Sequence, residues 1–116
     1  MPDDPRQTAQ AVIDGAAQLK QAVPAVMEGF AALGGGTYKP GALEPKAKEL
    51  IALAISITVR CDGCVAYHAR AAHNRGASRA EVAEAIGVAI HMGGGPSMVY
   101  GAEALRAYDT FAGAAG

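Results

Sequence analysis

Apolar side chains recur every three or four positions along most of this chain, which is the spacing of one face of an α-helix. Residues 6–22 show the pattern clearly and are expected to form the first helix. Its apolar positions are Ala9, Val12, Ala16 and Leu19. A second helix is expected to start at Pro24, because proline fits a first turn, and to end at the glycines of residues 34–36. Residues 37–43, with Pro40 and Gly41, are expected to form a loop.

The next segment, residues 46–59, follows Glu44 and Pro45 and is expected to be a helix from its length and its alanine and leucine content. Beyond Glu49 it is apolar on nearly every side, and such a helix should lie buried in the fold or in an interface between subunits. The β-branched residues between positions 55 and 59 alternate enough for a short strand to be the alternative. We prefer the helix.

Three further helices are expected after this segment. The first runs to Asn74 and is closed by Gly76, a residue type that commonly caps helix C-termini. Ser78 and Glu81 have the spacing of a capping box, which opens the next helix. Residues 93–96 break the chain before the last helix, and the small residues after position 111 are expected to be loose. The sequence therefore predicts an all-α fold of about six helices in a single domain over residues 1–116.

The composition narrows the functional classes. Hydrophobic residues make up 51% of the 116 positions and charged residues 18%, which argues against disorder and for a homo-oligomer that buries additional surface. The net charge of −1 and the lack of a lysine and arginine cluster argue against nucleic-acid binding. The acidic first residues and the short apolar run at residues 50–59 favour a cytoplasmic protein that does not associate with a membrane.

The candidate chemistry lies in residues 60–68, which hold both cysteines and one of the three histidines. At about 100° per residue, a helix places Cys61, Cys64 and His68 within an arc of roughly 60°. Two thiols at this spacing can cycle between dithiol and disulfide. A helix N-terminus favours the thiolate of Cys61, whereas the histidine one turn further on favours that of Cys64, so the spacing leaves the attacking thiol open. Glu49 is the candidate hydrogen-bond acceptor behind the imidazole.

A zinc site is the alternative for the same cluster, with His73 or Glu49 as a fourth ligand. Structural zinc sites usually draw their ligands from two separate knuckles, so we expect no bound metal. Tyr67 and Tyr100 are candidates for the lining of the site, although aromatic residues at helical spacing more often belong to a core.

The residues of this cluster and their surroundings resemble the alkylhydroperoxidase D-like branch of the carboxymuconolactone decarboxylase family. The resemblance is strongest over residues 40–105 and depends on a glutamate twelve positions before Cys-x-x-Cys-x-x-x-His. The matching stretches are residues 48–53, 60–64, 67–68, 76–78, Glu81 and 92–96. The resemblance implies an all-helical homo-oligomer, trimeric or hexameric, that reduces organic hydroperoxides without a bound cofactor.

The resemblance also implies a role for each residue of the cluster. Cys64 attacks the peroxide oxygen and becomes a sulfenic acid, and Cys61 resolves that acid to a disulfide. An external dithiol, either a donor protein or a small thiol, then restores both cysteines. His68 and Glu49 form the proton relay that activates the thiol and protonates the leaving alkoxide.

One position departs from the family pattern. The peroxidase members carry a second histidine directly before the second cysteine, where this chain has Gly63, so either peroxidase activity is weak or the natural oxidant differs. Three alternatives stay open, namely a general thiol-disulfide oxidoreductase, a metal-binding oligomeric domain without catalysis, and a lyase that uses His68 and Glu49 as acid and base. The decarboxylase branch of the family lacks the cysteine pair, so the resemblance favours redox chemistry.

Overall fold

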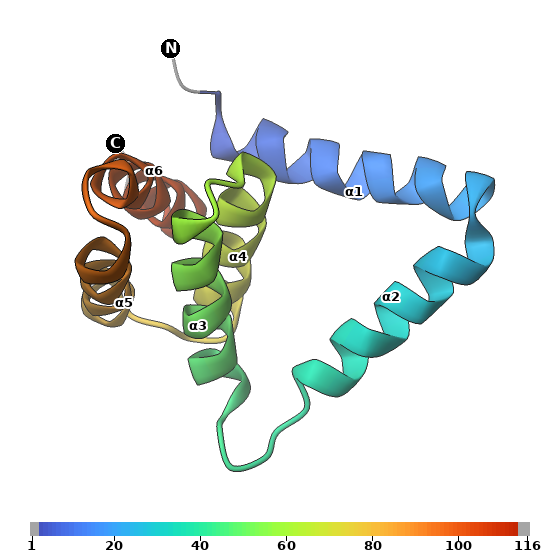
Figure 1. Ribbon diagram of the computed structural model, residues 1–116, viewed down its shortest axis with the longest axis horizontal. Helices are drawn as coiled ribbons and strands as arrows, with labels where there is room; N and C mark the ends of the chain where they lie inside the picture. Colours follow the sequence, from blue (N-terminus) through green and yellow to red (C-terminus); the bar gives the residue numbers. More distant parts are fainter. Residues whose placement is uncertain (1–2, 114–116) are drawn as a thin grey trace.

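In a computed structural model, residues 3–113 form six α-helices and no strand (Figure 1). The helices are α1 (Pro5–Ala22), α2 (Pro24–Thr37), α3 (Pro45–Thr58), α4 (Asp62–Asn74), α5 (Arg79–Gly93) and α6 (Gly95–Ala112). This confirms the predicted all-α class, and it confirms the helix over the strand at residues 55–59. Within the described part of the chain, no helix is both long enough and apolar enough to span a bilayer.

The helix ends follow the capping chemistry that the sequence predicts. Ser78 and Glu81 form a reciprocal capping box at the start of α5, with Glu81 N–H donating to Ser78 Oγ at 3.1 Å and Ser78 N–H donating to Glu81 Oε1 at 2.9 Å. At the end of α4, Gly76 adopts a φ of 86°, a left-handed conformation that glycine takes without strain. The N–H of Ala77 then donates to the carbonyl of Ala72 at 3.0 Å, which closes the helix.

The predicted end of α2 is wrong. The helix continues through the glycines of residues 34–36 to Thr37, and the loop starts at Tyr38. None of these glycines has a positive φ, so the left-handed turn with which glycine stops a helix does not form there. Lys48 of α3 donates from Nζ to the carbonyl of Thr37 at 2.9 Å, which satisfies a terminal carbonyl and places a cation at the negative end of the helix. Likewise, α6 extends past position 111 to Ala112, and residues 114–116 lie outside the described chain.

The core lies between α3, α4, α5 and α6. Leu53 and Ile57 of α3 and Val82 of α5 are fully buried in it, and small alanines of α4 and α6 let the helices approach closely. One face of α3 is buried in this core, as expected, and a second apolar stripe of the helix faces outward within the single chain. Its members Ile51, Ile55 and Val59 are exposed.

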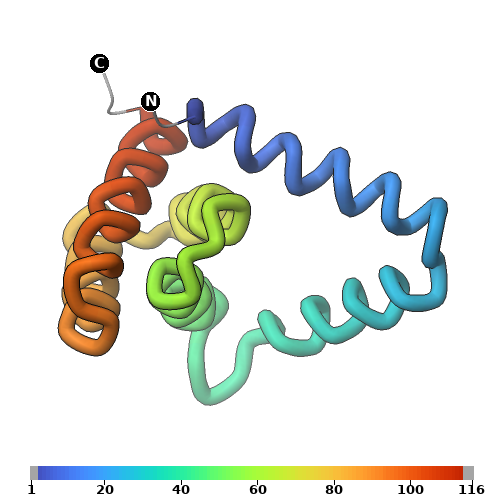
Figure 2. Tube along the Cα trace, turned by 45° about the horizontal axis from the view of Figure 1, so that its top comes forward, coloured from blue at the N-terminus to red at the C-terminus, as the bar shows by residue number. Residues whose placement is uncertain are grey.

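The first two helices extend from this four-helix body as a V-shaped arm (Figures 1 and 2). The first turns of α1 pack on α4 and α6, and Ala9 is fully buried there. By contrast, α2 packs mainly on α1 and contributes no buried residue. The radius of gyration is 14.2 Å, somewhat above the value of about 13.4 Å expected for a compact chain of this length. The arm is therefore the part of the chain with the least internal packing.

Candidate active site

The joint between α3 and α4 determines where the first cysteine lies. Arg60, which follows the C-cap residue Val59 of α3, adopts a φ of 58°, the left-handed conformation. Its N–H donates to the carbonyl of Ile57, and the N–H of Cys61 donates to the carbonyl of Ser56, both at 3.2 Å. This pair of bonds is a Schellman motif, which reverses the chain at a helix end. Cys61 follows as the N-cap of α4, so the end of one helix places the thiol at the start of the next.

The two cysteines are joined in a disulfide across the first turn of α4, with Cα atoms 5.2 Å apart. The backbone N–H of Cys64 donates to Cys61 Sγ at 3.2 Å. When the pair is reduced, this donor and the positive end of the helix dipole both favour a thiolate on Cys61. Both cysteines are partly exposed.

Glu49 and His68 form a hydrogen-bonded pair beside the disulfide. The distance between Glu49 Oε1 and His68 Nδ1 is 2.8 Å, and Glu49 is only 6% exposed although it is a carboxylate near a helix start. Because Nδ1 is engaged with the carboxylate, Nε2 is the imidazole nitrogen left for proton transfer. With Glu49 ionised, Nδ1 carries the proton and Nε2 accepts one, which is the arrangement of a general base held in place by a carboxylate.

Two tyrosines surround the imidazole of His68. Tyr67 meets it edge-on, with ring centroids 5.2 Å apart, and Tyr38 stacks on it with centroids 6.3 Å apart and an interplanar angle of 28°. Burial raises the pKa of Tyr38, and the negative charge of Glu49 raises it further. Tyr38 was not among the sequence candidates because it lies in a loop without periodicity, whereas Tyr100 packs against the core.

The four ligands of the zinc alternative are not brought together in this disulfide form. In residues 3–113 no three histidine, cysteine, aspartate or glutamate side chains are grouped as a metal site. His73 lies at the far end of α4, where its ring meets Tyr108 edge-on at 5.7 Å. Its role is therefore in packing, as is common for a histidine on a helix that faces the core.

The departure at Gly63 has a packing cause. A Cβ atom at this position would lie 2.8 Å from Cγ2 of Val12, well inside the contact distance of two carbon atoms. Helix α1 therefore covers the place where the peroxidase members carry their second histidine. The relay next to the disulfide consists of His68 and Glu49, and the two tyrosine rings pack around its imidazole.

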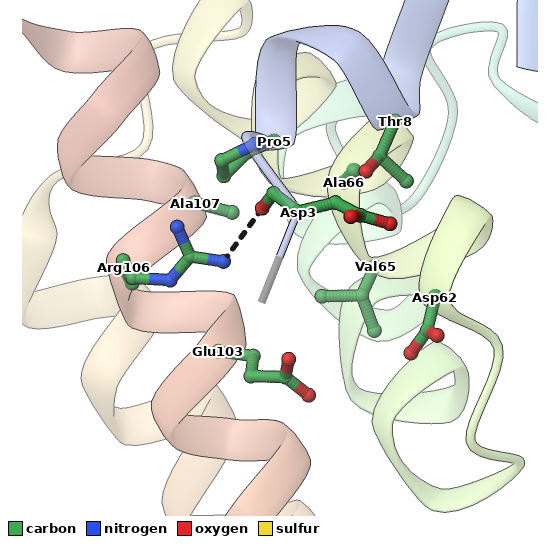
Figure 3. A pocket seen from close by; sticks show the side chains of 9 residues that line it. All are labelled: Asp3, Pro5, Thr8, Asp62, Val65, Ala66, Glu103, Arg106 and Ala107. Carbon is green, nitrogen blue, oxygen red and sulfur yellow. Dashed lines mark hydrogen bonds between the residues drawn. The ribbon is translucent and has the colours of Figure 1, made fainter. Parts of the chain in front are cut away.

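A separate pocket of about 190 Å³ opens between the start of α1, α4 and α6 (Figure 3). Its wall combines charged side chains, among them Asp62, Glu103 and Arg106, with apolar ones, and Arg106 Nη2 donates to the carbonyl of Asp3 at 3.0 Å. Neither cysteine lines it, and neither does His68 or Glu49. It lies on the neighbouring face of α4 and is not part of the candidate active site.

The sequence model of the carboxymuconolactone decarboxylase family matches residues 24–107, which include the whole cluster. The chain belongs to the carboxymuconolactone decarboxylase family. A crystal structure of a family member from Legionella pneumophila in its apo form has a TM-score of 0.91 and 37% sequence identity, and the match covers 95% of this chain and 98% of that one. The six-helix fold agrees with the alkylhydroperoxidase D-like branch.

Two further proteins are similar to this chain. A Thermotoga maritima family protein, whose name proposes an involvement in the antioxidative response, has a TM-score of 0.76 and 29% identity over 87% of this chain and 89% of its own. An uncharacterized protein from Cupriavidus necator is 38% identical over 91 residues, which are 78% of this chain and 80% of that protein.

Proposed function

We propose that this family member is a thiol-dependent hydroperoxide reductase. The observation that carries the proposal is the disulfide of Cys61 and Cys64 one helical turn before His68, whose Nδ1 is held by the buried Glu49 at 2.8 Å. Peroxide reduction by thiols requires a nucleophilic sulfur, a second sulfur that can form a disulfide with it, and an oriented group that accepts the thiol proton. The name of the Thermotoga maritima relative points in the same direction.

The oxidative step takes place at Cys64. His68 Nε2 accepts the thiol proton, and the Cys64 thiolate attacks the outer oxygen of the hydroperoxide. The S–O bond forms as the O–O bond breaks, which leaves a sulfenic acid on Cys64 and an alkoxide. The imidazolium returns its proton to the alkoxide, and an alcohol leaves. Glu49 stabilises the transient positive charge on His68, since its carboxylate accepts the hydrogen bond from Nδ1.

The resolving step uses Cys61. Its thiolate attacks Cys64 Sγ, the disulfide forms, and hydroxide leaves and takes up a proton to become water. The backbone N–H of Cys64 donates to Cys61 Sγ. This bond supports the resolving role, because it favours the thiolate form of Cys61 before the sulfenic acid forms.

An external dithiol completes the cycle. Its thiolate attacks Cys64 Sγ, Cys61 leaves as a thiolate, and the second thiol of the donor then displaces Cys64 from the mixed disulfide. The donor becomes a disulfide, and both cysteines of the protein are reduced. A thiolate that is already stabilised is the better leaving group, so the same contact to Cys61 Sγ that assists resolution also assists reduction.

Thiol counting tests the proposal. The reduced protein is mixed with one equivalent of cumene hydroperoxide, and free thiols and cumyl alcohol are measured together. The proposal predicts that two thiols disappear for each alcohol formed and that peptide mapping recovers the disulfide of Cys61 and Cys64. An unchanged thiol count would reject it. Serine at both positions is the matched control and should form no alcohol.

A second candidate is a thiol-disulfide oxidoreductase, which Gly63 favours because a relay histidine is missing at that position. Here Cys64 attacks a disulfide substrate in place of a peroxide, and Cys61 resolves the mixed disulfide with release of two thiols. Rates of thiol loss with cumene hydroperoxide and with glutathione disulfide, measured on the same preparation, separate the two. A faster reaction with the disulfide would favour this candidate.

We also propose that the chain assembles with copies of itself. Val26, Phe30 and Leu33 are each about two-thirds exposed on α2, a helix with no buried residue, and α3 carries a second exposed apolar stripe. Two different apolar surfaces on one chain suit a head-to-tail contact, which closes into a ring when the rotation permits.

Light scattering tests the assembly and should report an oligomer for the wild-type protein. Phe30→Glu should dissociate this oligomer, and Glu28→Gln, which changes an exposed neighbouring residue, should leave it intact. A monomeric wild-type protein would contradict this.

A further inference from the structure

The residue next to Glu49 holds the loop that carries Tyr38. Lys48 Nζ donates to the carbonyl of Thr37 at 2.9 Å and to the carbonyl of Lys39 at 2.7 Å. These two carbonyls flank Tyr38, so one ammonium group restrains the backbone on both sides of a single aromatic side chain. Because the charge is on the donor, each bond is stronger than a neutral one. Tyr38 is the first residue after α2, where the chain is otherwise free to change direction.

The restrained ring lies on the imidazole of the candidate relay. Tyr38 and His68 stack with ring centroids 6.3 Å apart, and Tyr67 contacts the same imidazole edge-on. Tyr38 is half-buried, and its burial and the negative charge of Glu49 both raise the pKa of its phenol. Tyr38 therefore covers a face of the hydrogen-bonded pair that would otherwise meet solvent.

Lys48 and Glu49 are consecutive residues of α3. Glu49 binds the imidazole of His68 directly, whereas Lys48 binds the loop whose Tyr38 ring stacks on that imidazole. Glu49 holds His68 from one side through Nδ1. Lys48 holds it from another side indirectly, by way of the loop and the Tyr38 ring. A general base needs a fixed direction toward its proton, and an imidazole that is held at one nitrogen alone can still tilt about that bond.

We propose that Lys48 and Tyr38 are positioning residues. The Lys48 ammonium fixes the loop, and the Tyr38 ring on that loop then holds the imidazole of His68 against tilting and shields its bond to Glu49 from water. The proposal rests on the proposed function for its effect on rate, and on geometry alone for its effect on the orientation of His68.

Four variants test the proposal. Tyr38→Phe keeps the ring and removes the hydroxyl, Tyr38→Ala removes both, and Lys48→Met removes the two bonds to the loop. Lys39→Met is the matched control, because it removes a neighbouring positive charge whose side chain is exposed and makes no such bond. Thermal unfolding identifies any variant that fails to fold, and Tyr38→Phe then carries the comparison with Lys48→Met.

The first readout is the NMR resonance of His68 Hε1, which the ring current of a stacked tyrosine displaces. We expect Tyr38→Phe and Lys39→Met to retain the wild-type shift, and Tyr38→Ala and Lys48→Met to move it in the same direction. The second readout is the single-turnover rate of thiol loss with cumene hydroperoxide. It should fall about 10- to 100-fold in Tyr38→Ala and Lys48→Met and stay near wild type in the other two.

A wild-type His68 resonance in Lys48→Met would overturn the proposal, and so would a Tyr38→Phe variant as slow as Tyr38→Ala, since the hydroxyl would then matter and not the ring. If the wild-type protein does not react with the hydroperoxide, the proposed function fails, and the NMR shifts alone decide whether Lys48 and Tyr38 orient His68.

Discussion

Replacing Glu49 by glutamine tests the part of the site that depends on charge. The amide oxygen of glutamine can still accept the hydrogen bond from His68 Nδ1, so the shape of the pair is kept and only the negative charge is lost. Glu49 is 6% exposed, and its distance to Nδ1 is 2.8 Å, so little solvent screens the interaction. The variant therefore isolates the stabilisation of the imidazolium that forms when Cys64 gives up its proton.

The size of the effect follows from this geometry. A hydrogen bond to a charged partner contributes about 1.5–3 kcal/mol and a neutral one about 0.5–1.5 kcal/mol, so the loss of the charge alone costs about 1–1.5 kcal/mol. Each 1.36 kcal/mol corresponds to a factor of ten in rate. If the charge of Glu49 acts in the transition state, Glu49→Gln should slow the oxidation of the reduced protein by about 5- to 13-fold.

The assay is single-turnover thiol loss with cumene hydroperoxide in stopped flow, beside the thermal unfolding midpoint of the same sample. Glu44→Gln is the matched control, since it removes an exposed carboxylate from the N-cap of the same helix, where it makes no capping bond. A wild-type rate in Glu49→Gln would refute the reasoning. So would a loss of rate that is matched by a collapse of the unfolding midpoint.

Three further predictions concern the elements around the site. Gly63→His should lower the free energy of unfolding by about 1–3 kcal/mol because its Cβ meets Val12, and Val12→Ala in the same chain should recover part of that loss in denaturant titrations. Arg60→Gly should raise the free energy of unfolding by about 0.5–1 kcal/mol, since glycine relieves the left-handed backbone at some entropic cost, and a lower denaturation midpoint would contradict this. The backbone N–H of Ser78 and then the Lys46 ammonium lower the pKa of Glu81 below its ordinary value, so its contribution to stability is present at neutral pH and is lost as the pH falls through the folded-state value. The unfolding midpoint of Glu81→Gln should therefore fall less on acidification than that of the wild type.

The sequence was sufficient for most of the helices because their ends depend on nearby residues. Ser78 and Glu81 are three positions apart, and Gly76 closes α4 with bonds to the preceding turn, so both signals are local. The spacing of Cys61, Cys64 and His68 is also local, and it placed the two thiols on one helix turn as expected.

The features that could not be predicted depend on contacts between distant parts of the chain. The glycines before Thr37 fail to end α2, and the carbonyl of Thr37 is held by Lys48, eleven residues away. The same lysine holds the loop in which Tyr38 stacks on His68, and the residues around Tyr38 show no periodicity from which this position could be predicted. The packing of Val12 over Gly63 joins two helices, so the sequence could show the missing histidine but not its cause.

The most direct test of the account is a sulfenic acid trap on the two single-cysteine variants. Cys61→Ser retains Cys64, and Cys64→Ser retains Cys61; each is reduced, treated with cumene hydroperoxide and dimedone, and analysed by mass spectrometry. The account predicts a dimedone adduct at Cys64 in Cys61→Ser and no adduct in Cys64→Ser. An adduct only at Cys61 would contradict the assignment of the attacking thiol, and the absence of an adduct in both variants would contradict hydroperoxide reduction by this pair.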